Sequence, residues 1–450
     1  MLTDRIRKCN QAPLRPGARY VLYRCSVNRR VEANHALTFV VELANHLGLP
    51  VLFYEQLGCE YPYASDRLHT FALQGSTETA ARAARLGIGY ALDLRWRRRS
   101  GDAGWRSALA RAAALVVDDY PYGLIAQTEV AQYAVDSSCI VPMRTWDERA
   151  YAAYSLRPKM RRILDRFLRP VPALRVHHRF RVAVPEFHTP VLPAAIPELV
   201  GRCEIDHSVP PSAQFPGGRA EALRRLRRFL RSRLRRYARH KNDPAMHATS
   251  DLSPYLHGGY LSSLEVALAA QNYARENRLM ADEFLEELIV RRELAFNFAC
   301  HTELPHSLRV LPEWARATLQ RHKRDRRDPA YAREQFDAGA TDDDLWNATQ
   351  RELRVRGKIH GYFRMYWGKK ILEWSRTPED ALQTMIYLND RYALDGQDPN
   401  SYANILWCFG LHDRPWPERP VYGTVRSMSR AGMERKTDVP AYLREIEALR

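Results

Sequence analysis

Short apolar runs alternate with helical stretches along the first 150 residues. Residues 21–24, 50–55, 114–119 and 139–143 are rich in β-branched and aromatic side chains and are predicted to be buried strands. Between the first two runs, residues 35–47 carry apolar side chains at helical spacing. Such alternation is typical of a parallel sheet covered by helices. We therefore expect a Rossmann-like α/β domain over residues 1–168.

The rest of the chain divides into two segments that differ in composition and periodicity. Residues 169–218 are rich in proline and glycine and show no periodicity, which predicts an interdomain linker. Beyond them, apolar positions recur at helical spacing over 220–241, 280–300, 361–375 and 380–393. Residues 219–450 are therefore expected to form a second, all-helical domain.

Charge is the first indication of a partner. The chain has 69 Lys and Arg residues against 52 Asp and Glu residues, a formal net charge of +17. This excess favours a polyanion such as nucleic acid, whose phosphates attract basic proteins regardless of sequence. An arginine-rich solvated surface is the simpler alternative.

Membrane and secretory features are not expected. No apolar run reaches the length of a membrane span, and the N-terminal residues lack an apolar leader segment. Seven cysteines are dispersed without a CxxC pair, which suits a reducing cytoplasm. The same dispersion argues against a disulfide framework and a structural zinc site, so no metal is predicted.

Two helical segments carry candidate ligand contacts. In residues 247–262, the hydroxyls of Thr249, Ser250 and Ser253 crowd a predicted helix start, a favourable place for phosphate. An ordinary helix cap is the alternative. In residues 284–294, Glu287 stands at the edge of an apolar stripe and could accept hydrogen bonds from a ligand. It could equally form a plain i,i+4 ion pair with Arg291, worth about 0.2–0.5 kcal/mol.

Two further segments are rich in aromatic and polar residues. In residues 358–374, Trp367 and Trp374 share one helix face about 10.5 Å apart along the axis. Aromatic stripes of this kind are usually core packing. Residues 388–420 are dense in Asp, Asn, Gly and Trp, which suits a ligand-lining loop or a surface turn.

Together these four segments resemble class II cyclobutane pyrimidine dimer (CPD) photolyases, of the photolyase/cryptochrome superfamily. The resemblance runs through most of residues 240–440 in order and spacing. It is most specific in the strings RMYWGKKILEW, YLNDRYALDGQDPN and WCFGLHDRPWPERPVYG. SLRPKM at 155–160 also fits, whereas CSVNRRVEANHAL at 25–37 departs from the family pattern.

The resemblance implies an antenna-type α/β domain, a helical FAD-binding domain and a set of site residues. The implied FAD contacts are Tyr237, Thr249, Ser250, Leu252, Ser253, Glu287, Arg291, Arg364 and Asp395. The implied catalytic residues are Glu287, Met365 and Trp407, which contact the dimer, and Asn389, near flavin N5. The implied electron-relay residues are Trp346, Trp367 and Trp374, and the implied DNA contacts are Arg414, Trp416 and Arg426.

The resemblance also implies an activity: light-driven repair by electron transfer from photoexcited, fully reduced FAD to a dimer flipped out of UV-damaged double-stranded DNA. A monomer in the cytoplasm, associated with the nucleoid when bound to DNA, is expected. A deazaflavin antenna is a further implication, although the departure at 25–37 leaves an empty antenna site open. A cryptochrome-like blue-light photoreceptor is the alternative with the same fold, and a basic, non-enzymatic nucleic-acid-binding protein is the alternative from another class.

Overall fold

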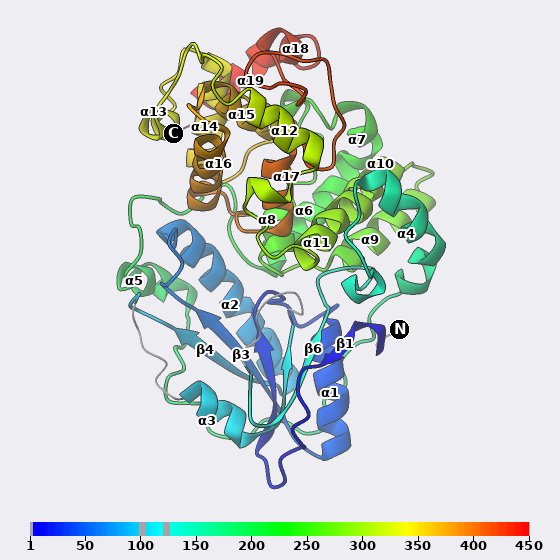
Figure 1. Ribbon diagram of the computed structural model, residues 1–450. Helices are drawn as coiled ribbons and strands as arrows, with labels where there is room; N and C mark the ends of the chain where they lie inside the picture. Colours follow the sequence, from blue (N-terminus) through cyan, green and yellow to red (C-terminus); the bar gives the residue numbers. More distant parts are fainter. Residues whose placement is uncertain (1–2, 99–104, 120–126, 450) are drawn as a thin grey trace.

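The computed structural model describes residues 3–98, 105–119 and 127–449. It has two parts that succeed each other along the chain. The N-terminal residues form a sheet with flanking helices, and the later residues form a larger helical part above it (Figure 1). This arrangement confirms the predicted fold class.

The N-terminal part is a six-stranded, mostly parallel sheet in the order β1-β6-β5-β2-β3-β4. Only the β1–β6 pairing is antiparallel. Helices α1, α2 and α3 pack against the strands. The strands are β1 (Ile6–Lys8), β2 (Tyr20–Cys25), β3 (Val51–Leu57), β4 (Gly89–Leu94), β5 (Ala113–Asp118) and β6 (Ala131–Val135), and the helices are α1 (His35–Leu47), α2 (Asp66–Leu86) and α3 (Trp105–Ala112).

One predicted strand is wrong. Residues 139–143 are buried but not in the sheet; the sixth strand is β6, eight residues earlier in the chain. The backbone N–H groups of Ile140 and Val141 donate to the carboxylate of Glu293, which lies in the helical part. The carboxylate of Glu293 accepts the hydrogen bonds that a neighbouring strand would otherwise accept. An apolar run can therefore be buried without being a strand.

The helical part surrounds a core that includes Trp346, Phe363 and Leu388. A second core cluster, which includes Phe229 and Leu264, lies under α6 and α9. The helices are α4 (Ala153–Phe167), α6 (Arg219–Ser232), α7 (Leu234–His240), α8 (Ser253–His257), α9 (Ser263–Glu276), α10 (Asp282–Leu285), the π-helical turn η5 (Glu286–Arg291), α11 (Arg292–Cys300), α12 (Glu313–Arg321), α13 (Arg333–Ala338), α14 (Asp344–Arg356), α15 (Gly361–Trp374), α16 (Pro378–Tyr392), α17 (Pro399–Trp407), α18 (Arg430–Glu434) and α19 (Val439–Glu447).

The segment between the two parts is more structured than its composition indicates. Residues 169–218 contain a short 3-10 helix, η3 (Pro193–Ala195), and one α-helix, α5 (Ile196–Gly201). The side chains of Ile196, Leu199 and Val200 on α5 are buried in the core of the sheet domain. Helix α4, which precedes this segment, contributes Leu156 and Met160 to a core cluster of the helical part. The domain boundaries at 168 and 218 stay a prediction.

None of the helices in the described ranges combines the length and apolar character that crossing a bilayer requires.

Candidate functional site

A cavity of about 420 Å³ opens within the helical part. It is lined by residues from α7, η5, α15 and α17 and from the segments before α8 and α17. We call it the central cavity. The predicted site residues that line it are Tyr237, Thr249, Ser250, Leu252, Ser253, Glu287, Arg364, Met365, Trp367 and Asp395. Residues separated by more than 150 positions in the sequence therefore meet in one cavity.

The hydroxyl-rich wall of the cavity is held by a break in a helix. The predicted helix over 220–241 is two helices, α6 and α7, interrupted at Arg233. The guanidinium of Arg233 donates to the carbonyl of Thr249 at 2.8 Å and to the carboxylate of Asp251 at 2.7 Å. Asp251 has a positive φ of 58°, a conformation that Asp tolerates better than most residues. These contacts fix the Thr249–Ser250 backbone at the cavity.

A largely buried ion pair adjoins this wall. Arg364 Nη2 donates to Asp395 Oδ1 at 2.9 Å. Burial alone would raise the pKa of the Asp395 carboxyl, but the charge of Arg364 and a hydrogen bond from Ser253 outweigh it and lower the pKa below its usual value. Arg364 Nε is buried and has no hydrogen-bond partner within the described chain, so this donor is available to a polar ligand.

Glu287 lines the cavity from the π-helical turn η5. Its carboxylate accepts from Lys241 Nζ at 2.9 Å, and Lys241 also binds Glu283 at 2.8 Å. The alternative ion pair with Arg291 is wrong. In a π-helix the bonds run i to i+5, so a residue four positions on is no longer directly above. The Arg291 guanidinium instead lies 3.8 Å from Glu286, and Arg291 is not part of the cavity lining.

The structure places Asn389 outside the cavity. Its side chain is 2% exposed and donates to the neighbouring Asp390, which also accepts from the Gln397 N–H. Asn389 thus supports the turn before α17. The carboxamides that do line the cavity are Asn242, Asn400 and Asn404. Sequence reasoning missed Asn404 because residues 388–420 were expected to be a loop or turn, whereas α17 carries Asn404 on its cavity side.

The three tryptophans predicted to relay electrons contact one another in series, starting at the cavity. Trp367 lines the cavity, and its Nε1 donates to Gln350 Oε1 at 2.9 Å. Its carbonyl accepts from Trp346 Nε1 at 3.0 Å. The Trp346 ring lies 6.2 Å from the Trp374 ring, centroid to centroid. Trp346, on α14, therefore contacts both Trp367 and Trp374, which lie on one face of α15.

The predicted DNA contacts gather around Trp416. The Arg426 guanidinium lies 4.1 Å from the Trp416 ring centroid, and that of Arg414 lies 5.3 Å away. Arg426 also lies 5.4 Å from the ring of Trp407. Trp407 is half-buried and is not part of the cavity lining, so its predicted dimer contact depends on a ligand that extends beyond the cavity.

A buried lysine lies on the other side of Trp407. Lys369 Nζ donates to the Cys408 carbonyl at 2.8 Å and lies 4.6 Å from the Trp407 ring centroid. Burial, with no carboxylate bound to the ammonium in the described structure, lowers the pKa of Lys369 to about 8.

This lowered pKa predicts a pH-dependent stability. Between pH 8 and about 10.5 the unfolded chain holds a proton that folded Lys369 has released, so the lysine destabilises least at high pH. The unfolding free energy of the wild type relative to Lys369→Met should therefore rise across this window, by up to about 3 kcal/mol. Urea unfolding at several pH values measures it, with Lys370→Met as the control for loss of a lysine from the same helix. Parallel curves for wild type and Lys369→Met would contradict the assignment.

The walls of the cavity suit a flavin nucleotide. Apolar side chains offer surface to a ring system, while the hydroxyls, Lys358 and the unpartnered Arg364 Nε offer groups for a polar chain. The apolar lining residues include Phe284, Leu288, Ile359, Met385 and Ile405. Arg364 and the hydroxyl wall are the residues that would hold the polar atoms of FAD.

Comparison with known proteins agrees with this geometry. The deoxyribodipyrimidine photo-lyase of Methanothermobacter thermautotrophicus is 37% identical over 458 residues, covering 99% of this chain and 98% of that protein. The Arabidopsis thaliana protein of the same name is 34% identical over 467 residues, covering 99% and 92%. No protein-family model matches the chain.

Solved structures show the same fold at low sequence identity. An archaeal photolyase from Sulfolobus tokodaii with two FAD molecules matches with a TM-score of 0.66 at 16% identity, over 94% of this chain and 89% of that one. A cryptochrome from Synechocystis matches with a TM-score of 0.67 at 14% identity, over 97% and 89%. The fold is therefore that of the photolyase/cryptochrome superfamily, and the predicted enzyme class is confirmed by the curated relatives. The chain belongs to the deoxyribodipyrimidine photo-lyase family.

Proposed function

We propose that this chain is a class II photolyase that repairs cyclobutane pyrimidine dimers in UV-damaged DNA under light, with FAD in the central cavity. The observation that carries the proposal is the lining of that cavity. Residues that the class II resemblance implies for FAD and for the dimer converge on it from distant segments. A cavity that only filled space in the core would be lined by apolar side chains, whereas this one is also lined by hydroxyls, an ion pair and a carboxylate.

In this proposal fully reduced FAD supplies a single electron when it absorbs light. The protein binds and orients the cofactor. Arg364 is fixed by Asp395 and presents its free Nε to the ligand, and Ser253 supports the same carboxylate. Asn404 replaces Asn389 as the proposed carboxamide near flavin N5, because Asn404 lines the cavity and Asn389 does not.

Damaged DNA is the proposed partner. A dimer must leave the duplex to reach the cavity, and a damaged, poorly stacked pair costs less to extrude. Arg414 and Trp416 lie on a surface segment where a cation stacked on an indole can enter the vacated stack. The net charge of +17 favours the phosphate backbone.

A cryptochrome would share the fold and the cofactor but would not need residues that contact a pyrimidine dimer. The exposed carboxylate of Glu287 and the side chain of Met365, both in the cavity lining, favour repair. A deazaflavin antenna and a monomeric state stay predictions.

A repair assay on purified protein tests the proposal. We expect about one FAD per chain, loss of cyclobutane dimers from irradiated DNA only under blue or near-UV light, and no repair of six-four photoproducts. Dark incubation and DNA containing only six-four photoproducts are the controls. Flavin without repair would favour the photoreceptor, and a colourless protein that binds DNA would favour the non-enzymatic alternative.

A further inference from the structure

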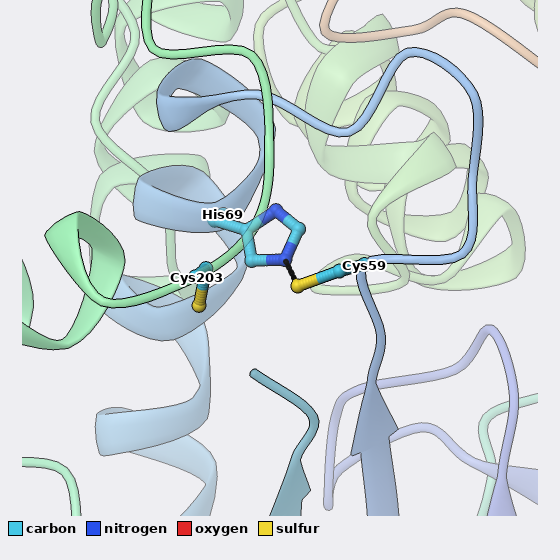
Figure 2. A group of neighbouring side chains, drawn as sticks. All are labelled: Cys59, His69 and Cys203. Atoms are coloured by element: carbon cyan, nitrogen blue, oxygen red, sulfur yellow. Dashed lines mark hydrogen bonds between the residues drawn. The ribbon is translucent and has the colours of Figure 1, made fainter. Parts of the chain in front are cut away.

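Two thiols and an imidazole meet inside the N-terminal part, far from the central cavity. Cys59 follows β3, His69 lies in the first turns of α2, and Cys203 follows α5, so the three come from separate segments (Figure 2). Their side chains are buried, with residue exposures of 0%, 2% and 3% respectively. The two sulfur atoms and a ring nitrogen all lie within 4.8 Å of one another.

The spacing of these atoms fits a tetrahedral metal centre. Cys59 Sγ lies 4.0 Å from His69 Nε2. Zinc bonds of about 2.3 Å to sulfur and about 2.0–2.1 Å to nitrogen would hold two such ligands roughly 3.6–3.8 Å apart in a tetrahedron. The atoms of the group, which lie within 4.8 Å of one another, would have to move closer by up to about 1 Å. The Cys59 thiol donates to the Arg95 carbonyl oxygen at 2.9 Å, and this oxygen could serve as a further ligand once the thiol has lost its proton.

The charges of the group also suit a divalent cation. Two thiolates and a neutral imidazole neutralise a 2+ ion, so the complex carries no net charge into a buried site. The thiolate is the form of cysteine that binds metals. Sulfur and imidazole ligands favour zinc over magnesium or calcium.

We propose that Cys59, His69 and Cys203 bind one Zn²⁺ ion that fastens the α5 segment to the sheet domain. The packing of the segment gives the ion a role. The α5 segment reaches the sheet core through Ile196, Leu199 and Ile205. It lies within the proline-rich stretch that joins the two parts, and backbone hydrogen bonds from Glu204 to the Trp96 carbonyl and from Asp206 to the Ala64 carbonyl also hold it to the sheet domain. An ion shared by the β3 turn, α2 and this segment would resist its detachment.

Metal analysis of the FAD-loaded protein tests the site. We expect about one zinc per chain after gel filtration, and X-ray absorption at the zinc edge should show two sulfur ligands and at least one imidazole nitrogen. The absorption measurement needs no variant, so it holds even where a substitution impairs folding. Cobalt added to metal-free protein with oxidised flavin should produce the long-wavelength bands of a thiolate-bound tetrahedral ion.

Variants then assign the ligands. Cys203→Ser and His69→Gln should lose zinc while retaining FAD, whereas Cys25→Ser, which changes another buried thiol of the same domain, should retain both. Limited proteolysis should cut the 190–205 region faster in the zinc-free variants. Three results would overturn the proposal. They are a wild type that is purified without zinc and does not take it up, a Cys59–Cys203 disulfide found by mass spectrometry, and full zinc content in Cys203→Ser.

Discussion

Replacing Trp367 with phenylalanine is expected to slow photoreduction of oxidised FAD by an external reductant by an order of magnitude or more. Trp367 is the member of the predicted relay that lines the central cavity. Trp346 donates to its carbonyl, and the rings of Trp346 and Trp374 lie 6.2 Å apart between centroids. Phenylalanine keeps most of the apolar volume but lacks the easily oxidised indole. Trp346→Phe and Trp374→Phe should act in the same direction.

The relay restores the cofactor and is separate from the repair step. Trp367→Phe that has been chemically reduced beforehand should therefore repair dimers at close to the wild-type rate. The loss of packing, and of the hydrogen bond to Gln350, should cost about 1–3 kcal/mol of stability. Trp314→Phe is the matched control, since Trp314 packs against the same core cluster but lies outside the series. If photoreduction per bound flavin survives in all three relay variants, the tryptophans are only core packing.

Glu287→Ala is expected to reduce repair per absorbed photon by about 10–100-fold, which corresponds to losing a charged hydrogen bond worth about 1.5–3 kcal/mol. The carboxylate lines the cavity and is held by Lys241 at 2.9 Å. Its side chain is 44% exposed, so the carboxylate can reach a dimer that enters from solvent. FAD should remain bound, because the hydroxyl wall and the Arg364–Asp395 pair are unchanged.

Glu283→Ala offers a closely matched control for this experiment. Glu283 accepts from the same Lys241 ammonium, at 2.8 Å, but is not part of the cavity lining. It should therefore leave the repair yield near the wild-type value. Equal losses in Glu283→Ala and Glu287→Ala would assign the effect to Lys241 and its electrostatics. If Glu287→Ala changes neither the repair yield nor the affinity for the dimer, Glu287 does not contact the dimer and serves only as an ion-pair partner of Lys241.

Local patterns in the sequence were enough for the fold class. Runs of β-branched and aromatic residues predicted β2, β3 and β5, and helical spacing predicted α1, because each pattern needs only a neighbouring apolar layer to take up its structure. They failed at 139–143, where Glu293 supplies the hydrogen bonds that a strand would have made. They also merged α6 and α7, since the break at Arg233 depends on Thr249 and Asp251, which lie outside the helix.

The family resemblance predicted ten of the residues that line the central cavity. Spacing on a helix could not decide the partner of Glu287, because the π-helical turn displaces Arg291 and Lys241 arrives from another helix. It could not distinguish Asn389 from Asn404 either, since both lie in one polar segment and only the packing of α17 turns one of them inward.

The sequence by itself determined the two-part architecture, the net positive charge and ten of the residues that line the cavity, because these depend on local periodicity, composition and the family resemblance. Tertiary structure alone decided which distant groups meet. Trp346 joins Trp367 and Trp374 only because α14 packs on α15. Cys59, His69 and Cys203 share no local spacing, so the expectation of no metal could not foresee their convergence. The physical reason is that chain-distant contacts depend on how helices and sheet pack, which no short window of sequence contains.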